Sequence, residues 1–218
     1  MKLTADAYGE AEAAYADGWE RIDGWLYHIC AASDHSSRVD VQAKITIVGR
    51  TYSAGLERHV VLQNGQEDRL AVAADHLAAH GREIDSWLEL LTPATGELTP
   101  GRLSEVVEVH GLFTSLLAEV CRASPRSFSS KYLHFHCPDV PVYDSYATAA
   151  LCADFPLSPG VRPFLKPAGA DEEYYFYCCR FWTMYERAQL KGLKPRLKVL
   201  DHMLWERGAA IYDAAAKG

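Results

Sequence analysis

A lysine and an aspartate close together in the chain are the residues whose types and spacing best suit covalent chemistry. Lys131 and Asp144 lie in the stretch SFSSKYLHFHCPDVPVYDSYATAAL, residues 127–151. A lysine whose pKa is lowered by burial can act as a nucleophile. A carboxylate can stabilise positive charge that develops in a transition state. The pair is therefore suited to a site where a nucleophile meets a carbon atom that becomes positively charged.

The same stretch also has structural interpretations. An aspartate directly before a helix is most often an N-cap, worth about 1 kcal/mol, and a lysine that follows several serines is most often solvated. His134, His136 and Cys137 are types that bind metals, but two histidines two positions apart on a helix face different ways. We therefore expect core packing there, with no metal and no cofactor.

The elements that must position these residues are helices along almost the whole chain. Apolar residues recur at three- and four-residue steps over 5–32, with a break expected near Gly24, and over 68–91. A β-branched run at 44–48 has no second strand to pair with, so we interpret it as part of a buried helix. Thr99 is expected to cap a helix that begins at Pro100, and two more helices are expected over 172–191 and 195–216.

The stretch around Lys131 predicts a helix, a polar hairpin, a short helix, a link and a further helix. The hairpin is expected over residues 122–130, RASPRSFSS, which are small and polar. Lys131 is expected to open the short helix, which Pro138 ends. Asp144 is expected to cap the helix over 145–153.

This order of elements resembles the helix-hairpin-helix DNA glycosylase superfamily. Ser127, Phe128 and Ser129 stand where the family has glycine, an apolar residue and glycine. Lys131 stands where bifunctional members carry their nucleophilic lysine. Asp144, in PVYDSY, stands where the family has its catalytic aspartate. Both glycines are replaced by serines here. The lysine-to-aspartate spacing is also shorter than is usual in the family, which implies a trimmed helix. Because a trimmed helix would not bring the amine to the sugar carbon, we expect a monofunctional enzyme.

A second, looser resemblance covers more of the chain. Uncharacterised bacterial proteins with a core of the form SFASKY…H…P…PIYDS are similar to residues 127–145, and the likeness includes residues 43–52 and 175–205. It implies a glycosylase that acts on modified bases, in repair or in phage defence.

A glycosylase needs a pocket for the flipped base and contacts with DNA phosphates. Aromatic or polar-tipped residues are expected to form the base pocket, although most aromatic residues of a globular protein lie in its core: Tyr52, Tyr132, His136, Tyr143, Tyr146 and Trp182. Basic and hydroxyl residues of the hairpin and of the C-terminal region are expected to bind phosphates, unless they only form solvated faces: Arg122, Arg126, Ser127, Ser129, Ser130, Lys194, Arg196 and Lys198.

Length and composition are those of a globular protein. The 218 residues are 49% hydrophobic, and a chain of this size buries roughly 70% of its unfolded surface. No apolar run approaches the ~20 residues that span a bilayer, so we expect a cytoplasmic protein with no membrane partner. We also expect a monomer. The net charge of −7 argues against a general polyanion binder, so DNA binding would depend on local basic clusters.

These observations predict an all-α, two-lobed helical bundle with a helix-hairpin-helix glycosylase-like core. The chain is expected to be one domain, with lobes over 1–98 and 99–218. The resemblance implies a DNA N-glycosylase that releases a damaged or modified base, modified phage cytosine included, from double-stranded DNA to leave an abasic site. The alternatives are a non-catalytic helix-hairpin-helix nucleic-acid-binding or interaction protein and a structural or toxin-neutralising module. An abasic-site product distinguishes the N-glycosylase from the non-catalytic nucleic-acid-binding protein.

Overall fold

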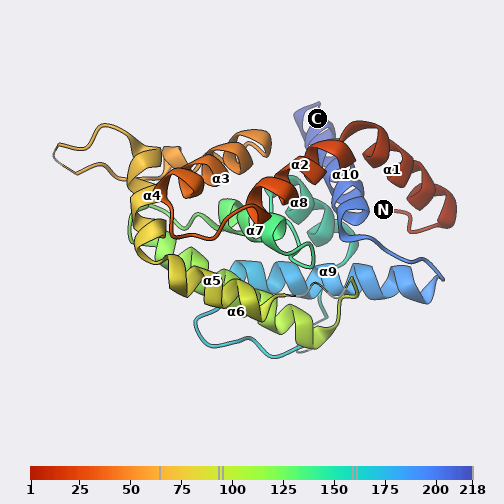
Figure 1. Ribbon diagram of the computed structural model, residues 1–218. Helices are drawn as coiled ribbons and strands as arrows, with labels where there is room; N and C mark the ends of the chain where they lie inside the picture. Colours follow the sequence, from red (N-terminus) through yellow and green to blue (C-terminus); the bar gives the residue numbers. More distant parts are fainter. Residues whose placement is uncertain (64, 93, 95, 159, 161, 218) are drawn as a thin grey trace.

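The protein is built from helices joined by loops (Figure 1). The computed structural model describes residues 1–63, 65–92, 94, 96–158, 160 and 162–217. Within these residues there are ten α-helices, one short 3₁₀ helix, η1 (Leu56–Arg58), and no strand beyond an isolated bridge between Val60 and Cys121. The prediction of an all-α fold is confirmed.

The helices of the first half follow the predicted pattern but are shorter. The pattern over 5–32 divides at Trp19, not at Gly24, and the pattern over 68–91 divides at His80. The β-branched run at 44–48 lies inside a helix, as predicted. The helices are α1 (Ala5–Gly18), α2 (Glu20–Ala31), α3 (Arg38–Thr51), α4 (Arg69–Ala79) and α5 (Gly81–Leu90).

Except for α7, the helices of the second half begin at or within two residues of the expected positions. The Thr99 side chain accepts a hydrogen bond from Arg102 N at 3.1 Å, and Pro100 is the first helical residue. The prediction of this capped start is confirmed. The helices are α6 (Pro100–Ala118), α7 (Arg126–His136), α8 (Ser145–Asp154), α9 (Glu172–Leu190) and α10 (Leu197–Ala216).

The polar hairpin lies earlier in the chain than predicted. Helix α7 begins at Arg126, so Ser127 and Ser129 belong to its first turn, and Lys131 lies within the helix instead of opening it. Ser129 N donates to Pro125 O at 2.9 Å. The turn therefore occupies residues 119–125. The serines that were aligned with the family's hairpin glycines have helical backbone, so their N–H groups are not arranged as an anion-binding hairpin.

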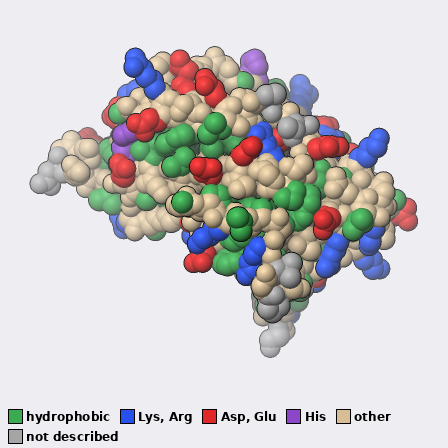
Figure 2. All heavy atoms as spheres, turned by 90° about the horizontal axis from the view of Figure 1, so that it is seen from below, with side chains coloured by type: hydrophobic (Ala, Val, Ile, Leu, Met, Phe, Trp, Pro, Cys, Tyr) green, Lys and Arg blue, Asp and Glu red, His purple; other side chains and the backbone are tan. Residues whose placement is uncertain are grey.

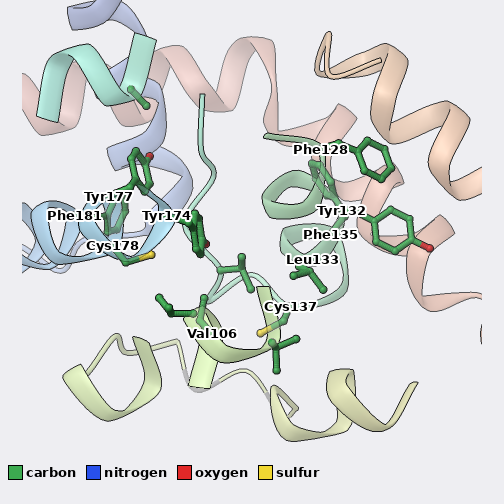
Figure 3. Packing of buried hydrophobic residues seen from close by; sticks show 14 of the residues in the cluster. Val106, Phe128, Tyr132, Leu133, Phe135, Cys137, Tyr174, Tyr177, Cys178 and Phe181 are labelled. Atoms are coloured by element: carbon green, nitrogen blue, oxygen red, sulfur yellow. The ribbon is translucent and has the colours of Figure 1, made fainter. Parts of the chain in front are cut away.

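Helix α7 forms the middle of the core (Figures 1 and 3). It packs against α2, α3 and α6, and its buried side chains include Phe128, Tyr132, Leu133 and Phe135. The Tyr132 ring stacks on Phe113 of α6 with 5.2 Å between centroids. A helix enclosed on several sides holds its side chains in fixed rotamers, so α7 is a rigid support for Lys131.

Helices α8 and α10 approach each other unusually closely. A Cβ added to Gly208 of α10 would lie 2.2 Å from Tyr146 O of α8, so only glycine fits this position. Helix α10 also packs against α1. The contact at Gly208 places the middle of α10 beside the start of α8, where Asp144 is the N-cap.

The surface of the protein mixes both signs of charge. On the face seen in Figure 2, acidic and basic side chains are interspersed, with hydrophobic side chains between them. No helix in the described part of the chain has the length and the apolar character that crossing a membrane requires.

Candidate functional site

Lys131 and Asp144 line the same cavity. Its volume is about 710 Å³, within the range of roughly 300–1,000 Å³ that small-molecule sites have. Five parts of the chain form it: the junction of α1 and α2, the C-terminal end of α3, the first turns of α7, the start of α8 with the residues just before it, and the first half of α10. Residues far apart in the sequence thus meet around one space.

Lys131 is a buried amine with two fixed partners. Its side chain is 5% exposed, and Nζ donates to Tyr52 O and to Ser127 Oγ, both at 3.2 Å. Burial lowers the pKa of Lys131 below its usual value, although Asp144 and Asp201 oppose this effect. A neutral amine has two N–H bonds, which these two acceptors can take, and its lone pair then remains available for attack on carbon.

Asp144 is the N-cap of α8, as predicted. Its Oδ1 accepts a hydrogen bond from Ala147 N at 2.8 Å, and Thr148 Oγ1 donates to the Asp144 carbonyl at 2.7 Å. The cap uses one carboxylate oxygen and fixes the side chain. The other oxygen has no hydrogen-bond partner among the described residues, which leaves it available to a ligand.

Asp201 is a second carboxylate in the cavity, and the sequence analysis did not single it out. Its side chain is 14% exposed, and Oδ2 accepts from Lys198 Nζ at 3.1 Å. Burial raises the pKa of Asp201; Lys198 and Lys131 oppose the shift and Asp144 adds to it. The i,i+3 spacing of Lys198 and Asp201 on one helix is the only local signal that could have indicated it.

Lys198 is held by a buried network at the base of the cavity. Its ammonium has three acceptors, Tyr52 OH at 2.9 Å, Asp201 Oδ2 at 3.1 Å and Asp23 Oδ2 at 3.3 Å. Tyr15 OH and Tyr52 OH donate to the carboxylate of Asp23, which is fully buried. Burial alone would lower the pKa of Lys198, but Asp201 and Asp23 together raise it. Lys198 therefore carries a fixed positive charge and orients Asp201.

Aromatic side chains form much of the cavity wall. Three residues predicted for a base pocket, Tyr52, Tyr143 and Tyr146, line it. Trp19 and Trp205 also line it and were not predicted. The Trp19 and Tyr52 rings lie 5.7 Å apart, and the Tyr146 and Trp205 rings lie 6.0 Å apart.

The other three residues predicted for a base pocket lie elsewhere. Tyr132 is in the core, where its hydroxyl is 2.8 Å from His35 Nε2. His136 packs beside His35, with 5.0 Å between ring centroids. Trp182 stacks on Tyr185 within α9. Sequence periodicity does not distinguish an aromatic residue of the core from one that borders a cavity, because both lie on the buried face of a helix.

The residues predicted to bind phosphates are mostly engaged within the protein. Arg126 pairs with Asp171 and Glu173, Arg196 pairs with Glu12 and Glu20, and Lys198 is buried in the network described above. Ser129 and Ser130 are buried, and Ser127 accepts from Lys131. Arg122 and Lys194 are exposed.

The histidines singled out in the sequence do not gather around a metal site in the described residues, where no group of three His, Cys, Asp or Glu side chains is placed to hold an ion. His134 uses both ring nitrogens within the core. Nδ1 donates to Val140 O at 2.7 Å, so Nε2 accepts from Tyr27 OH at 2.6 Å.

No protein-family model, curated protein or solved structure matches this chain. The cavity itself therefore carries the functional argument. It combines two carboxylates, a buried amine and aromatic walls, which together suit the stabilisation of a cationic transition state next to a planar ring.

Proposed function

We propose that this protein is a DNA N-glycosylase that releases a damaged or modified base. One observation carries the proposal: Lys131 of α7 and Asp144, the N-cap of α8, line a single cavity with aromatic walls. The resemblance of their sequence context to helix-hairpin-helix glycosylases supports the same chemistry. The position of the hairpin before Arg126 departs from that family's pattern, so the proposal depends on the cavity rather than on a phosphate-binding hairpin.

The hydrolytic route assigns a separate task to each carboxylate. The bond between the sugar C1′ and the base nitrogen breaks, and its electron pair leaves with the base. Asp144 stabilises the positive charge that develops on the sugar, while Asp201 donates a proton to the departing nitrogen. Burial raises the pKa of Asp201 and thereby favours its protonated form. Water then adds to C1′ and passes a proton to Asp144, which leaves an abasic site.

Lys131 offers a second route through a covalent intermediate. Because burial lowers its pKa, a larger share of the side chain is the neutral amine that can attack C1′. The base again leaves with the bonding electrons and the proton of Asp201. The amine forms the Nζ–C1′ bond as the bond to the base breaks, and one of its protons passes through Asp144 to the ring oxygen O4′. The C1′–O4′ bond then opens, which leaves a protonated Schiff base on Nζ that water hydrolyses.

Substitution of Asp144 tests the proposal. Asp144→Asn is expected to keep the fold, since asparagine caps helices about as well as aspartate, while base release falls by two or more orders of magnitude, about 3 kcal/mol of transition-state stabilisation. The measurement is the yield of alkali-labile sites in DNA of differing base modification. Asp68→Asn is the matched control, because Asp68 caps α4 away from the cavity. Full activity of Asp144→Asn would reduce this residue to a helix cap.

A borohydride arm of the same experiment separates the two routes. The covalent route gives an adduct that borohydride traps and that Lys131→Ala abolishes. The hydrolytic route gives intact abasic sites and no adduct. The alternative of a non-catalytic nucleic-acid-binding protein predicts neither product.

A further inference from the structure

Three basic side chains in or beside the cavity, Arg126, Arg196 and Lys198, are each flanked by two carboxylates. The Arg196 guanidinium lies over the ring of Tyr15, which lines the cavity, at 5.7 Å, and pairs with Glu12 and Glu20. The Arg126 guanidinium lies over the cavity residue Tyr143 at 5.6 Å, and pairs with Asp171 and Glu173.

Inside the cavity, Lys198 lies between Asp23 and Asp201 in the same way. Each of these groups has an excess of negative charge.

This arrangement opposes the binding of duplex DNA. A duplex carries one negative charge per about 1.7 Å of its axis, and proteins that bind it use unneutralised Lys and Arg to contact several phosphates. The two arginines that lie over cavity tyrosines, Arg126 and Arg196, are already neutralised, and the whole chain has a net charge of −7.

Aromatic surface is exposed where the cavity opens to solvent. Trp19 is 40% exposed and Trp205 is 49% exposed, and both line the cavity. Tyr146 lies between Trp205 and Tyr212, with ring centroids 6.0 and 5.0 Å away, and Tyr212 is 47% exposed. Exposed aromatic rings beside a site are suited to stacking on unpaired bases.

We propose that the cavity accepts an unpaired nucleoside unit, recognised by stacking against Trp19 and Trp205 and not by contacts with duplex phosphates. This inference rests on the proposed N-glycosidic chemistry and defines the form of its substrate. The nucleoside can come from single-stranded DNA or from a free nucleoside, and both sources present an exposed base and sugar.

A binding experiment tests this inference without the need for turnover. A fluorescently labelled oligonucleotide, single-stranded or annealed to its complement, is titrated with the full-length protein, and free nucleosides are added as competitors. We expect the single strand to bind at least tenfold more tightly than the duplex. The slope of log K against log salt should be below about 1.5 in magnitude, corresponding to no more than two phosphate contacts. If free nucleosides at millimolar concentration compete with the oligonucleotide, an isolated nucleoside is sufficient for binding. If they do not compete although the single strand binds, the ligand is single-stranded DNA.

Tryptophan variants locate the contact. Trp205→Ala, on the exposed face of α10, is expected to weaken single-strand binding about tenfold, within the range measured for loss of one stacking partner. Trp19→Ala should act in the same direction. Trp25→Ala is the matched control, because Trp25 is 59% exposed and does not line the cavity.

Two results would overturn the inference: duplex bound as tightly as single strand with a steep salt dependence, or Trp205→Ala indistinguishable from Trp25→Ala. If duplex binds as tightly as single strand, and if the protein releases bases from duplex in a reaction that Asp144→Asn abolishes, then this inference fails while the proposed glycosylase function stands. Conversely, stacking-dependent binding of the single strand with no base released from any DNA supports the inference while the glycosylase proposal fails.

Discussion

Asp23 is a buried carboxylate whose partners come from three other parts of the chain. Its carboxylate is fully buried and accepts from Tyr15, Tyr52 and Lys198. A buried charge is tolerated only where opposite charge and hydrogen bonds compensate for lost hydration. Because Lys198 also binds Asp201, the group that stabilises Asp23 is the one that orients a carboxylate of the cavity. Stability and the proposed function are therefore expected to be coupled at this lysine.

Lys198→Met should expose this dependence, since methionine keeps much of the side-chain length but removes the charge. Breaking a buried pair leaves an uncompensated charge, and we expect the free energy of unfolding to fall by about 3–5 kcal/mol. Urea denaturation measures the change. The double variant Asp23→Asn with Lys198→Met should recover a large part of it, whereas Lys194→Met, at an exposed position, should change stability by less than about 0.5 kcal/mol. Equal losses in the single and double variants would contradict the coupling.

At the scale of elements, the local signals in the sequence predicted the capped starts of α6 and α8 well, but they predicted the start of α7 and the contacts between helices poorly. Thr99 with Pro100, and Asp144, act within four residues of themselves, so the caps could be predicted. The breaks at Trp19 and His80 could not, because the apolar pattern continues across both. Lys198 looked like part of a basic surface cluster. Lys198 can be buried because Asp23 and Tyr52 bind its ammonium group. Only tertiary packing brings these residues together, so the sequence pattern could not indicate the burial.

The packing of α8 on α10 makes a prediction at this scale. In Gly208→Ala the added Cβ meets the backbone oxygen of Tyr146, 2.2 Å away in the present packing, so the helices must separate. Overpacking of this kind costs about 1–3 kcal/mol. It should also lower base release, because Asp144 begins one of these helices and Asp201 lies on the other.

Thermal unfolding and the assay for alkali-labile sites provide the two measurements. Gly24→Ala is the control, since a Cβ at Gly24 of α2 meets nothing within 4 Å; it should be neutral or stabilising by up to about 1 kcal/mol. A Gly208→Ala protein as stable and active as the wild type would show that α10 can shift without consequence.

At the scale of the whole molecule, the core encloses several histidines in neutral form. Burial lowers the pKa of His134 to about 3 and that of His110 to about 4. Burial also lowers the pKa of His35 and of His136. His110 lies on α6, His134 and His136 lie on α7, and His35 lies between α2 and α3, so their protonation affects the packing of much of the core. Burial raises the pKa of Asp201, so protonation of this carboxyl favours the folded state as the pH falls. It is a single group set against four histidines.

The expected consequence is a loss of stability in mild acid. A folded-state pKa below the unfolded value of about 6.5 means that the unfolded chain binds more protons as the pH falls. The stabilisation is complete above about pH 6.5. It decreases as the pH falls toward the folded-state values, by up to about 1.4 kcal/mol per pH unit for each such histidine. Urea unfolding at intervals from pH 7.5 to 4.5 measures the slope.

His134→Asn should lower stability at neutral pH, because it loses the acceptor for Tyr27 OH, yet its stability should depend less steeply on pH than that of the wild type. A free energy of unfolding that stays constant from pH 7 to 4.5 would show that these histidines are not held neutral by the fold.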